Sequence, residues 1–111
     1  NHVGVLTIEL FETDNNLVVN EMAPRVHNSG HWTIEGARTS QFENHIRAVC
    51  KLDQVNLNKI SNAEMFNLIG DQIIIHRKKK YGPDEYFFDY LKKEIKTKRK
   101  MGHLTVLKKI K

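Results

Sequence analysis

Hydrophobic and polar residues alternate along the first stretch of the chain, Val3–Phe11. A period of two residues is typical of a β-strand. The cluster Thr13–Asn16 is rich in turn formers, and Leu17–Asn20 is expected to return as a second strand. The pattern therefore predicts a β-hairpin at the start of the chain. One face of its first strand is expected to carry Leu6, Ile8 and Leu10, and the other Val5, Thr7 and Glu9.

A helix is predicted from Gln41 to Cys50. Ser40 followed by Glu43 has the spacing of a capping box, which marks the start of a helix. The apolar side chains that follow have helical spacing, so they are expected to form one face. These residues are Phe42, Ile46 and Val49.

The second half of the chain shows weaker patterns. Residues 51–62 are rich in Asn and Lys and are expected to form a linker, followed by a buried strand over Met65–Gly70 and a further strand over His103–Leu107. Residues 83–98 allow two interpretations. Pro83 near the start, acidic residues early and lysines late favour a helix, but a strand remains possible. A helix would place Phe87, Leu91 and Ile95 on one face.

The composition is that of an ordinary soluble protein, with 40% hydrophobic and 28% charged residues in a chain of 111. This length suggests one domain or parts of two. No apolar run approaches the roughly 18 residues of a membrane span, and no signal-peptide pattern is present, so we expect a cytoplasmic protein without a membrane partner. The single cysteine, Cys50, fits a reducing compartment. The strand-like start without Met and the uncapped end lead us to expect a piece of a longer protein.

The net charge is +5, and much of the excess lies in the runs 76–80 and 96–100. Basic runs of this kind are usually solvated surface, and less often they bind phosphate or nucleic acid. Tyr81 and Tyr86 could stack on bases, but no nucleic-acid-binding motif is recognisable. A small basic nucleic-acid-binding module is therefore the alternative interpretation.

Two carboxylates, Glu9 and Glu21, lie on the two arms of the predicted hairpin. A three-residue loop with Asn16 in the left-handed conformation would place them directly opposite each other. Like charges in such positions repel, and a bridging divalent cation such as Mg²⁺ turns the repulsion into attraction. A two-residue loop would instead put Glu21 on the other face and leave one glutamate simply exposed. Together with Asn20 and the loop that follows, we favour the metal site.

The predicted ordered loop 23–32 gathers polar side chains around Pro24 and Gly30. Arg25 offers a fork for phosphate or carboxylate, His27 can donate a hydrogen bond or transfer a proton, and Asn28 can donate and accept. A surface loop with a capping asparagine is the simpler interpretation of each residue alone. His27 and His31 have metal-ligand spacing, but the intervening Asn-Ser-Gly argues against a helix, so we expect no zinc site there.

These segments resemble the 5-(carboxyamino)imidazole ribonucleotide synthases, a family of ATP-grasp enzymes. The resemblance implies an α+β fold in which residues 1–50 end an ATP-grasp domain, 51–62 form a linker and 63–111 form a small β-rich C-terminal domain. It also favours a strand ending at Tyr90. The motifs that carry it are Gly4–Phe11, Val19–Trp32, Thr39–Glu43, His45–Ala48, Asn67–Gly70 and Arg99–His103.

The resemblance also implies an activity. Family members use ATP and bicarbonate to carboxylate the amino group of 5-aminoimidazole ribonucleotide, and they are typically homodimers. Glu9 and Glu21 would hold Mg²⁺ at the ATP phosphates, with Asn20 beside them. Small-molecule substrates rather than nucleic acid are expected. The N-terminal domain and the lid that grips ATP lie outside this sequence, so the chain alone is expected to be inactive.

Further roles are implied residue by residue. Arg25 would stabilise the transferred phosphoryl group, and His27 and Asn28 would position the bicarbonate-derived group. Lys92 and Arg99 fall where the family places basic residues on the nucleotide 5′-phosphate. The sequence departs from the family pattern at two positions, because Leu91 and Lys98 each stand where a glycine is usual.

Overall fold

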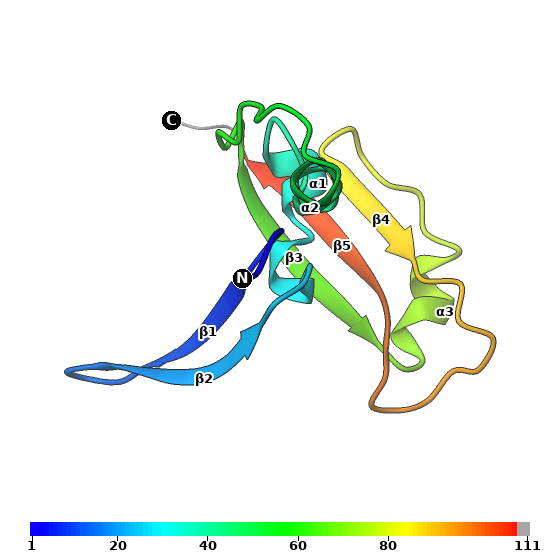
Figure 1. Ribbon diagram of the computed structural model, residues 1–111. Coiled ribbons are helices and arrows are strands. Elements are labelled where there is room, and N and C mark those ends of the chain that lie inside the picture. Colours follow the sequence, from blue (N-terminus) through cyan, green and yellow to red (C-terminus); the bar gives the residue numbers. More distant parts are fainter. Residues whose placement is uncertain (109–111) are drawn as a thin grey trace. The chain divides into compact units, whose positions relative to one another are not determined.

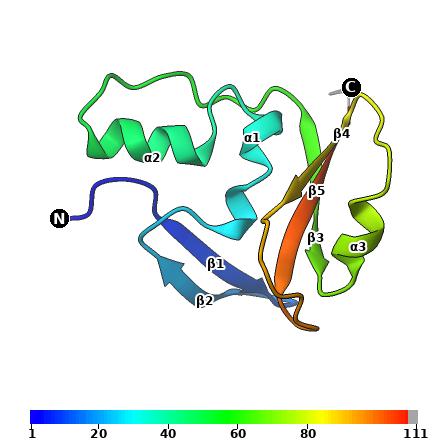
Figure 2. The ribbon, with the colours of Figure 1, turned by 90° about the vertical axis from the view of Figure 1, so that its right-hand side faces the viewer.

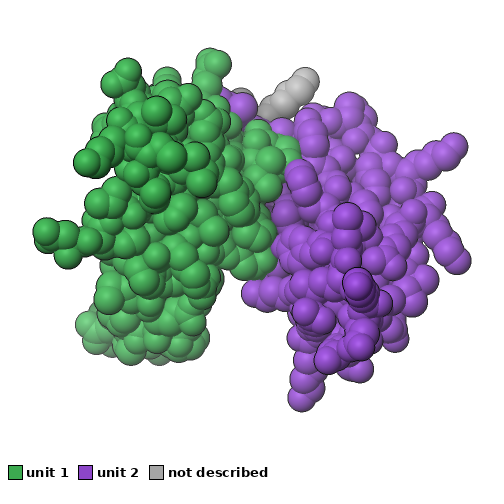
Figure 3. Space-filling model, turned by 45° about the vertical axis from the view of Figure 1, so that its right-hand side comes forward, with its two compact units in different colours: residues 1–58 green, residues 59–111 purple. Residues whose placement is uncertain are grey.

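The computed structural model describes residues 1–108, so the expectation about the last residues of the chain lies partly outside the described residues. The chain divides into two compact units, residues 1–58 and the residues from Lys59 onward (Figure 3). Helices and strands occur in both, which confirms the predicted α+β fold (Figure 1). Among residues 1–108, no helix combines the length and apolarity that a membrane crossing needs.

The first unit begins with an antiparallel hairpin of β1 (Thr7–Glu12) and β2 (Leu17–Ala23). The first strand starts at Thr7 rather than at Val3. Gly4 has φ 122°, and the Val5 N–H donates to the His45 ring (3.1 Å) instead of to a neighbouring strand. In Figure 2 this segment runs alongside α2 before it enters β1.

The hairpin turn differs from the predicted three-residue loop. The Thr13 N–H donates to the Asn16 carbonyl (2.9 Å), which leaves Asp14 and Asn15 as a two-residue connection. Asn16 is not among the residues with positive φ, so the expected left-handed conformation there is wrong. The register changes by one residue between Glu9 and Leu10, which makes Asn20 an extra, bulged residue of β2.

The loop after β2 contains two short helical elements that the sequence pattern did not predict. These are η1 (Asn28–Gly30), a 3-10 turn, and α1 (Thr33–Gly36). Asn-Ser-Gly forms one tight 3-10 turn, and His27 before it is extended (φ −135°, ψ 152°), so no α-helix runs from His27 to His31.

The predicted helix is present as α2 (Gln41–Val49), one residue shorter than expected. Ser40 caps it, and its side chain accepts a hydrogen bond from the Glu43 N–H (3.2 Å). The apolar face predicted for this helix is solvent-exposed, with Ile46 58% and Val49 53% accessible.

The second unit is a three-stranded antiparallel sheet in the order β3 (Asn62–Ile69), β5 (Lys100–Lys108), β4 (Glu85–Asp89). The strand predicted over His103–Leu107 is confirmed and extends in both directions. The strand alternative for residues 83–98 is also confirmed, although β4 ends at Asp89 and not at Tyr90. Pairing of β4 with β5 outweighs the local helix propensity.

The strand predicted over residues 65–70 is longer and less buried than expected. Alternate residues of β3 are covered, and Phe66 on the other face is 50% exposed. The small core joins Leu68, Met101 and Phe87 with Ile73 of α3 (Gln72–His76), a helix that was not predicted. Figure 1 shows α3 beside the end of β3.

Candidate functional site

Glu9 and Glu21 lie directly opposite each other in the hairpin. The two-residue turn alone would pair Glu9 with Asn20, and the bulge at Asn20 moves Glu21 into that place. The displaced Asn20 donates from Nδ2 to Glu9 Oε2 (3.2 Å). The carboxylates and the amide predicted to act together therefore do lie together, although the device that aligns them differs from the one expected.

His27 joins this pair from the following loop. Its Nε2 lies 3.2 Å from Glu21 Oε1, and its Nδ1 lies 3.5 Å from Glu9 Oε1. The side chain is only 12% exposed, against 35% for Glu9 and 47% for Glu21. The imidazole is therefore held at the inner side of the two carboxylates.

Ser29 fixes the orientation of the His27 ring. The Ser29 N–H donates to His27 Nδ1 (3.3 Å), and the Ser29 hydroxyl lies 2.9 Å from the same nitrogen. Because Nδ1 accepts, the proton of the neutral ring sits on Nε2, which faces Glu21. Ser29 was not assigned to the site from the sequence, and its position two residues after a histidine that caps a tight turn is the signal that could have found it.

The three side chains Glu9, Glu21 and His27 offer ligand atoms that all lie within 4.8 Å of one another. Two opposed carboxylates suit a hard cation, which prefers oxygen ligands and takes few of them from the protein when phosphate is also present. Repulsion between the carboxylates is a cost that a cation removes. The donor set therefore fits Mg²⁺ held by Glu9 and Glu21, with the His27 imidazole left for another partner.

Arg25 and Asn28 flank His27 in the chain. Arg25 is exposed, and its guanidinium Nη1 donates to the Val26 carbonyl (3.1 Å), so the fork lies at the surface of the loop. Asn28 is half-buried and begins η1, and its carbonyl accepts from the His31 N–H (3.1 Å). Both residues are thus close to His27 in the sequence, and the exposed Arg25 side chain can reorient in solvent.

A buried glutamine, Gln41, holds the backbone of His27 through its side-chain amide. Gln41 is the first residue of α2, and sequence reasoning treated it only as part of that helix. No pattern in the sequence indicates its role, because its partners His27 and His31 lie 14 and 10 residues away and are brought to it by the folded loop.

Lys92 and Arg99 belong to the second unit. Lys92 Nζ donates to the Lys100 carbonyl (2.6 Å) and lies 5.4 Å from the centre of the Tyr90 ring. The Arg99 side chain is exposed, and its carbonyl accepts from the Gly70 N–H (3.0 Å). Leu91 has φ 52°, a conformation that favours glycine, which explains why a glycine is expected at this position.

Several residues of the basic runs are paired with acids of the same unit. Arg77 Nε lies 2.6 Å from Asp89 Oδ2, and Lys79 Nζ lies 3.5 Å from Glu85 Oε1. The hydrogen bond from Arg77 holds the pKa of Asp89 below its ordinary value, because it stabilises the ionised carboxylate. This pairing reduces the positive field that a nucleic-acid surface would need, and it favours a structural role for the first basic run.

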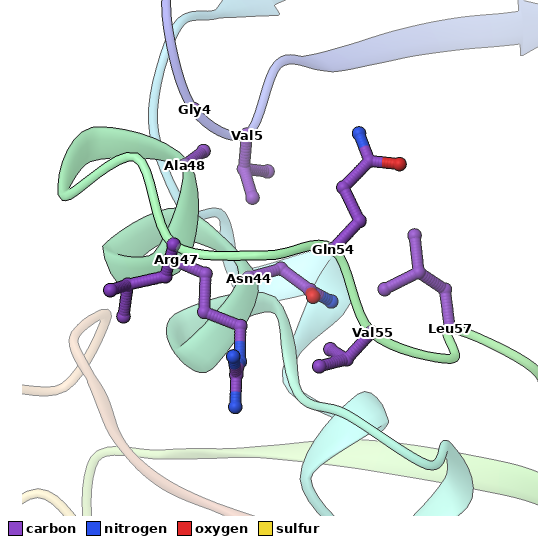
Figure 4. Close-up of a pocket in the computed structure, with 9 residues that line it drawn as sticks. Gly4, Val5, Asn44, Arg47, Ala48, Gln54, Val55 and Leu57 are labelled. Atoms are coloured by element: carbon purple, nitrogen blue, oxygen red, sulfur yellow. The ribbon is translucent and has the colours of Figure 1, made fainter.

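A cavity of about 460 Å³ lies in the first unit, away from the carboxylates. Figure 4 shows that it opens between the segment before β1, helix α2 and the extended chain after it. Apolar side chains contribute most of its surface, and Arg47 and Asn44 contribute its polar groups. The residues that line it are Gly4, Val5, Asn44, Arg47, Ala48, Leu52, Gln54, Val55 and Leu57.

Comparison with known families divides the chain in the same way as the fold. Residues 1–42 match the ATP-grasp domain, and residues 63–111 match the phosphoribosylaminoimidazole carboxylase C-terminal domain. The first match thus contains the hairpin, the loop after it and the first two residues of α2. The second match contains most of the three-stranded sheet.

Individual proteins give the same result. N5-carboxyaminoimidazole ribonucleotide synthase from Vibrio vulnificus is 45% identical over 106 residues, and the protein of the same name from Bacillus subtilis is 46% identical over 110 residues. A crystal structure of N5-carboxyaminoimidazole synthetase from Staphylococcus aureus has a TM-score of 0.85 at 42% identity. The synthase from Aspergillus clavatus, solved with ADP and 5-aminoimidazole ribonucleotide, has a TM-score of 0.84 at 36% identity.

The coverage of these matches is unequal. They take in 95–97% of this chain, but the chain spans only 28–30% of the length of these relatives.

Proposed function

The chain belongs to the ATP-grasp family of N5-carboxyaminoimidazole ribonucleotide synthases, and from this premise we propose that it forms the C-terminal part of such an enzyme. The complete enzyme uses ATP and bicarbonate to carboxylate the amino group of 5-aminoimidazole ribonucleotide. The products are ADP, phosphate and the N5-carboxylated ribonucleotide. The chain alone lacks the length of the relatives, so the activity is that of the complete protein.

The observation that carries this proposal is the convergence of Glu9, Glu21 and His27 in one cluster. An ATP-dependent carboxylation must bring a phosphoryl donor and a bicarbonate oxygen together. Catalysis then consists of orientation and of stabilising charge as the phosphoryl group moves. Two carboxylates for a cation beside one imidazole supply both elements at a single place.

Mg²⁺ is the cation proposed for this site, held by Glu9 and Glu21 with Asn20 beside them. When bound, it supplies positive charge that neutralises the phosphate oxygens of ATP. Asn20 keeps Glu9 in place through its hydrogen bond to Oε2. The two carboxylates would thereby hold the cation at the phosphate end of ATP.

The loop residues receive the substrate roles. The exposed guanidinium of Arg25 would stabilise the transferred phosphoryl group, because its planar fork matches two phosphate oxygens. His27 presents a protonated Nε2 in its neutral form, and Asn28, the next residue, carries an amide that can donate and accept. Together His27 and Asn28 would orient the carboxylate derived from bicarbonate toward the amine.

Lys92 and Arg99 are proposed to bind the 5′-phosphate of the ribonucleotide. The exposed Arg99 side chain supports this role directly. Lys92 would have to release the Lys100 carbonyl to reach a phosphate, which makes its assignment the more demanding of the two. Substitution of each residue by Gln should raise the KM for the ribonucleotide and leave the KM for ATP unchanged.

We also propose that the complete enzyme is a cytoplasmic homodimer, as the family resemblance implies. Sedimentation of the complete enzyme tests the assembly, since a monomer at micromolar concentration would contradict it.

The experiment that tests the function measures ADP release by the complete enzyme with and without 5-aminoimidazole ribonucleotide. We expect ribonucleotide-dependent release that Glu21→Gln abolishes. Glu12→Gln is the matched control, because Glu12 lies in the same hairpin opposite Leu17 and outside the cluster. Absence of ribonucleotide-dependent release in the wild type would overturn the proposal, and full activity of Glu21→Gln would overturn the metal assignment.

A further inference from the structure

We propose that Gln41 is a positioning residue of the site. It holds the backbone of His27 and makes no contact with the substrate itself. The inference rests on the proposed function for its catalytic consequence, and on the geometry alone for the contact itself. Gln41 Oε1 accepts from the His27 N–H (3.0 Å), and Gln41 Nε2 donates to the His27 carbonyl (2.7 Å). The Gln41 side-chain amide therefore bonds both backbone polar groups of His27, the N–H and the carbonyl.

The orientation of this amide is determined by its partners. The His27 N–H can only donate, so it must face the oxygen of Gln41. The nitrogen then faces the His27 carbonyl and also lies 2.7 Å from His31 Nδ1. Both hydrogens of the amide are thereby used. Because the amide is fully bonded and Gln41 as a whole residue is only 7% exposed, the amide has no alternative partner in solvent, which makes the arrangement rigid.

The base of the Gln41 side chain is anchored as firmly as its tip. Ser40 caps α2, and the Gln41 N–H donates to Thr33 Oγ1 (2.9 Å). The same hydroxyl donates to the Gly30 carbonyl (2.5 Å). The start of α2 is thus tied to the turn that carries the site loop, and the glutamine reaches back from this fixed point to His27.

Gly30 leaves the space that the glutamine occupies. A Cβ at position 30 would lie 2.5 Å from Gln41 Oε1 and 2.8 Å from its Cδ. No positive φ is recorded at Gly30, so close approach rather than backbone conformation explains the glycine here. The loop and the amide are therefore fitted to each other.

The two hydrogen bonds from Gln41 to the His27 backbone form a clamp, and this clamp matters because both nitrogens of the His27 ring have partners. Its Nε2 lies 3.2 Å from Glu21 Oε1 while its Nδ1 accepts from the Ser29 N–H, so a shift of the ring changes the surroundings of both nitrogens. A misplacement of about 1 Å in a positioned group can cost about 100-fold in rate. Loss of the clamp should therefore lower kcat through His27, while the site for ATP stays intact.

The first test uses Gln41→Glu in the complete enzyme. The carboxylate has the same shape and keeps an acceptor for the His27 N–H, but it turns an oxygen toward the His27 carbonyl. We expect kcat to fall about 10- to 100-fold with the KM for ATP within twofold of wild type. Gln72→Glu is the matched control. Gln72 also accepts from a backbone N–H through its Oε1, that of Ile69 (2.7 Å), and it lies in the second unit.

A double-mutant cycle separates positioning from general loss of structure. In the His27→Ala background, Gln41→Glu should cause no further fall in kcat, because the residue it acts through is gone. Multiplicative losses would overturn the proposal. Gly30→Ala supplies an independent route: it should reproduce the loss in the wild type and add little in the Gln41→Ala background.

A third measurement does not depend on catalysis. Amide hydrogen exchange of His27, followed by NMR, should accelerate at least tenfold in Gln41→Ala and stay unchanged in Gln72→Glu. Unchanged protection in Gln41→Ala would overturn the clamp. If the wild type lacks ribonucleotide-dependent turnover, the proposed function fails, and the exchange measurement alone then decides whether Gln41 holds His27.

Discussion

Glu21 faces Glu9 because one residue, Asn20, bulges out of β2 between the hairpin turn and the cluster. The two carboxylates are held opposite each other by the backbone, and like charges in this arrangement destabilise a hairpin by about 0.2–1 kcal/mol. The hairpin therefore carries a local cost that a bound cation removes.

Glu9→Gln should have opposite effects with and without Mg²⁺. Without the ion, we expect unchanged or slightly higher thermal stability, because the repulsion from Glu21 disappears and the amide oxygen can still accept from Asn20. With Mg²⁺ in excess, the wild type should melt at a higher temperature and the variant should not, since only the wild type gains from binding. Glu12→Gln serves as the control, and an equal Mg²⁺ response in Glu9→Gln would exclude Glu9 as a ligand.

Ser40→Ala should weaken the start of α2 and the loop that depends on it. Ser40 accepts from the Glu43 N–H, and loss of such a cap costs about 0.5–2 kcal/mol. Chemical denaturation of the chain measures this loss. Ser40→Asp keeps an acceptor at the same place, so it should retain most of the stability. Equal losses in both variants would contradict a capping role.

The Arg77–Asp89 pair makes the stability of the second unit depend on pH. The pKa of Asp89 is lowered in the folded chain, chiefly by the Arg77 hydrogen bond, so its contribution is present above the unfolded value of about 3.9. It is lost as the pH falls through the lower folded pKa. We expect a decrease in the free energy of unfolding below about pH 4 that is smaller in Asp89→Asn. Glu94→Gln is the control, because the Glu94–Lys96 pair is largely exposed and should leave the pH dependence unchanged.

Gly102→Ala should strongly destabilise the three-stranded sheet. The added Cβ would lie 2.3 Å from the Phe88 carbonyl oxygen and 3.0 Å from Ile73 Cδ1, so the backbone of β4 must move. Forcing atoms into a packed region costs about 1–3 kcal/mol. Gly82→Ala is the matched control, because its nearest neighbour, Glu85 Oε2, lies at 3.6 Å. Thermal melts of both variants give the comparison, and equal stability would contradict the packing.

The hairpin illustrates how far local sequence could predict this fold. Alternation correctly indicated two strands with Glu9 and Glu21 on them, and Ser40 correctly indicated the start of α2. The prediction failed where a residue bonds a partner that is distant in the sequence. His45 takes the Val5 N–H from forty positions away and so delays the start of β1. No residue pattern within the two strands predicts the bulge, because its effect, the alignment of Glu9 with Glu21, is visible only in the paired hairpin.

The second unit gives the complementary case. Local propensity over residues 83–98 favoured a helix, and pairing with β5 produced a strand instead. Phe87 also packs against the core formed by Leu68, Ile73 and Met101, and these contacts come from other segments of the chain. In the site, Gln41 was missed for the same reason. Its partners His27 and His31 are brought to it by the folded loop, and no spacing rule describes that return.

The fit between Gly30 and Gln41 also restricts the order in which the sequence can change over evolutionary time. A side chain at position 30 would displace the end of the long amide at position 41, whereas loss of the amide does not require any change at position 30. Lineages that keep the glutamine are thus expected to keep the glycine, and the reverse dependence should be weaker. Positions 30 and 41 are therefore expected to be epistatic, because the effect of a substitution at position 30 depends on the residue at position 41.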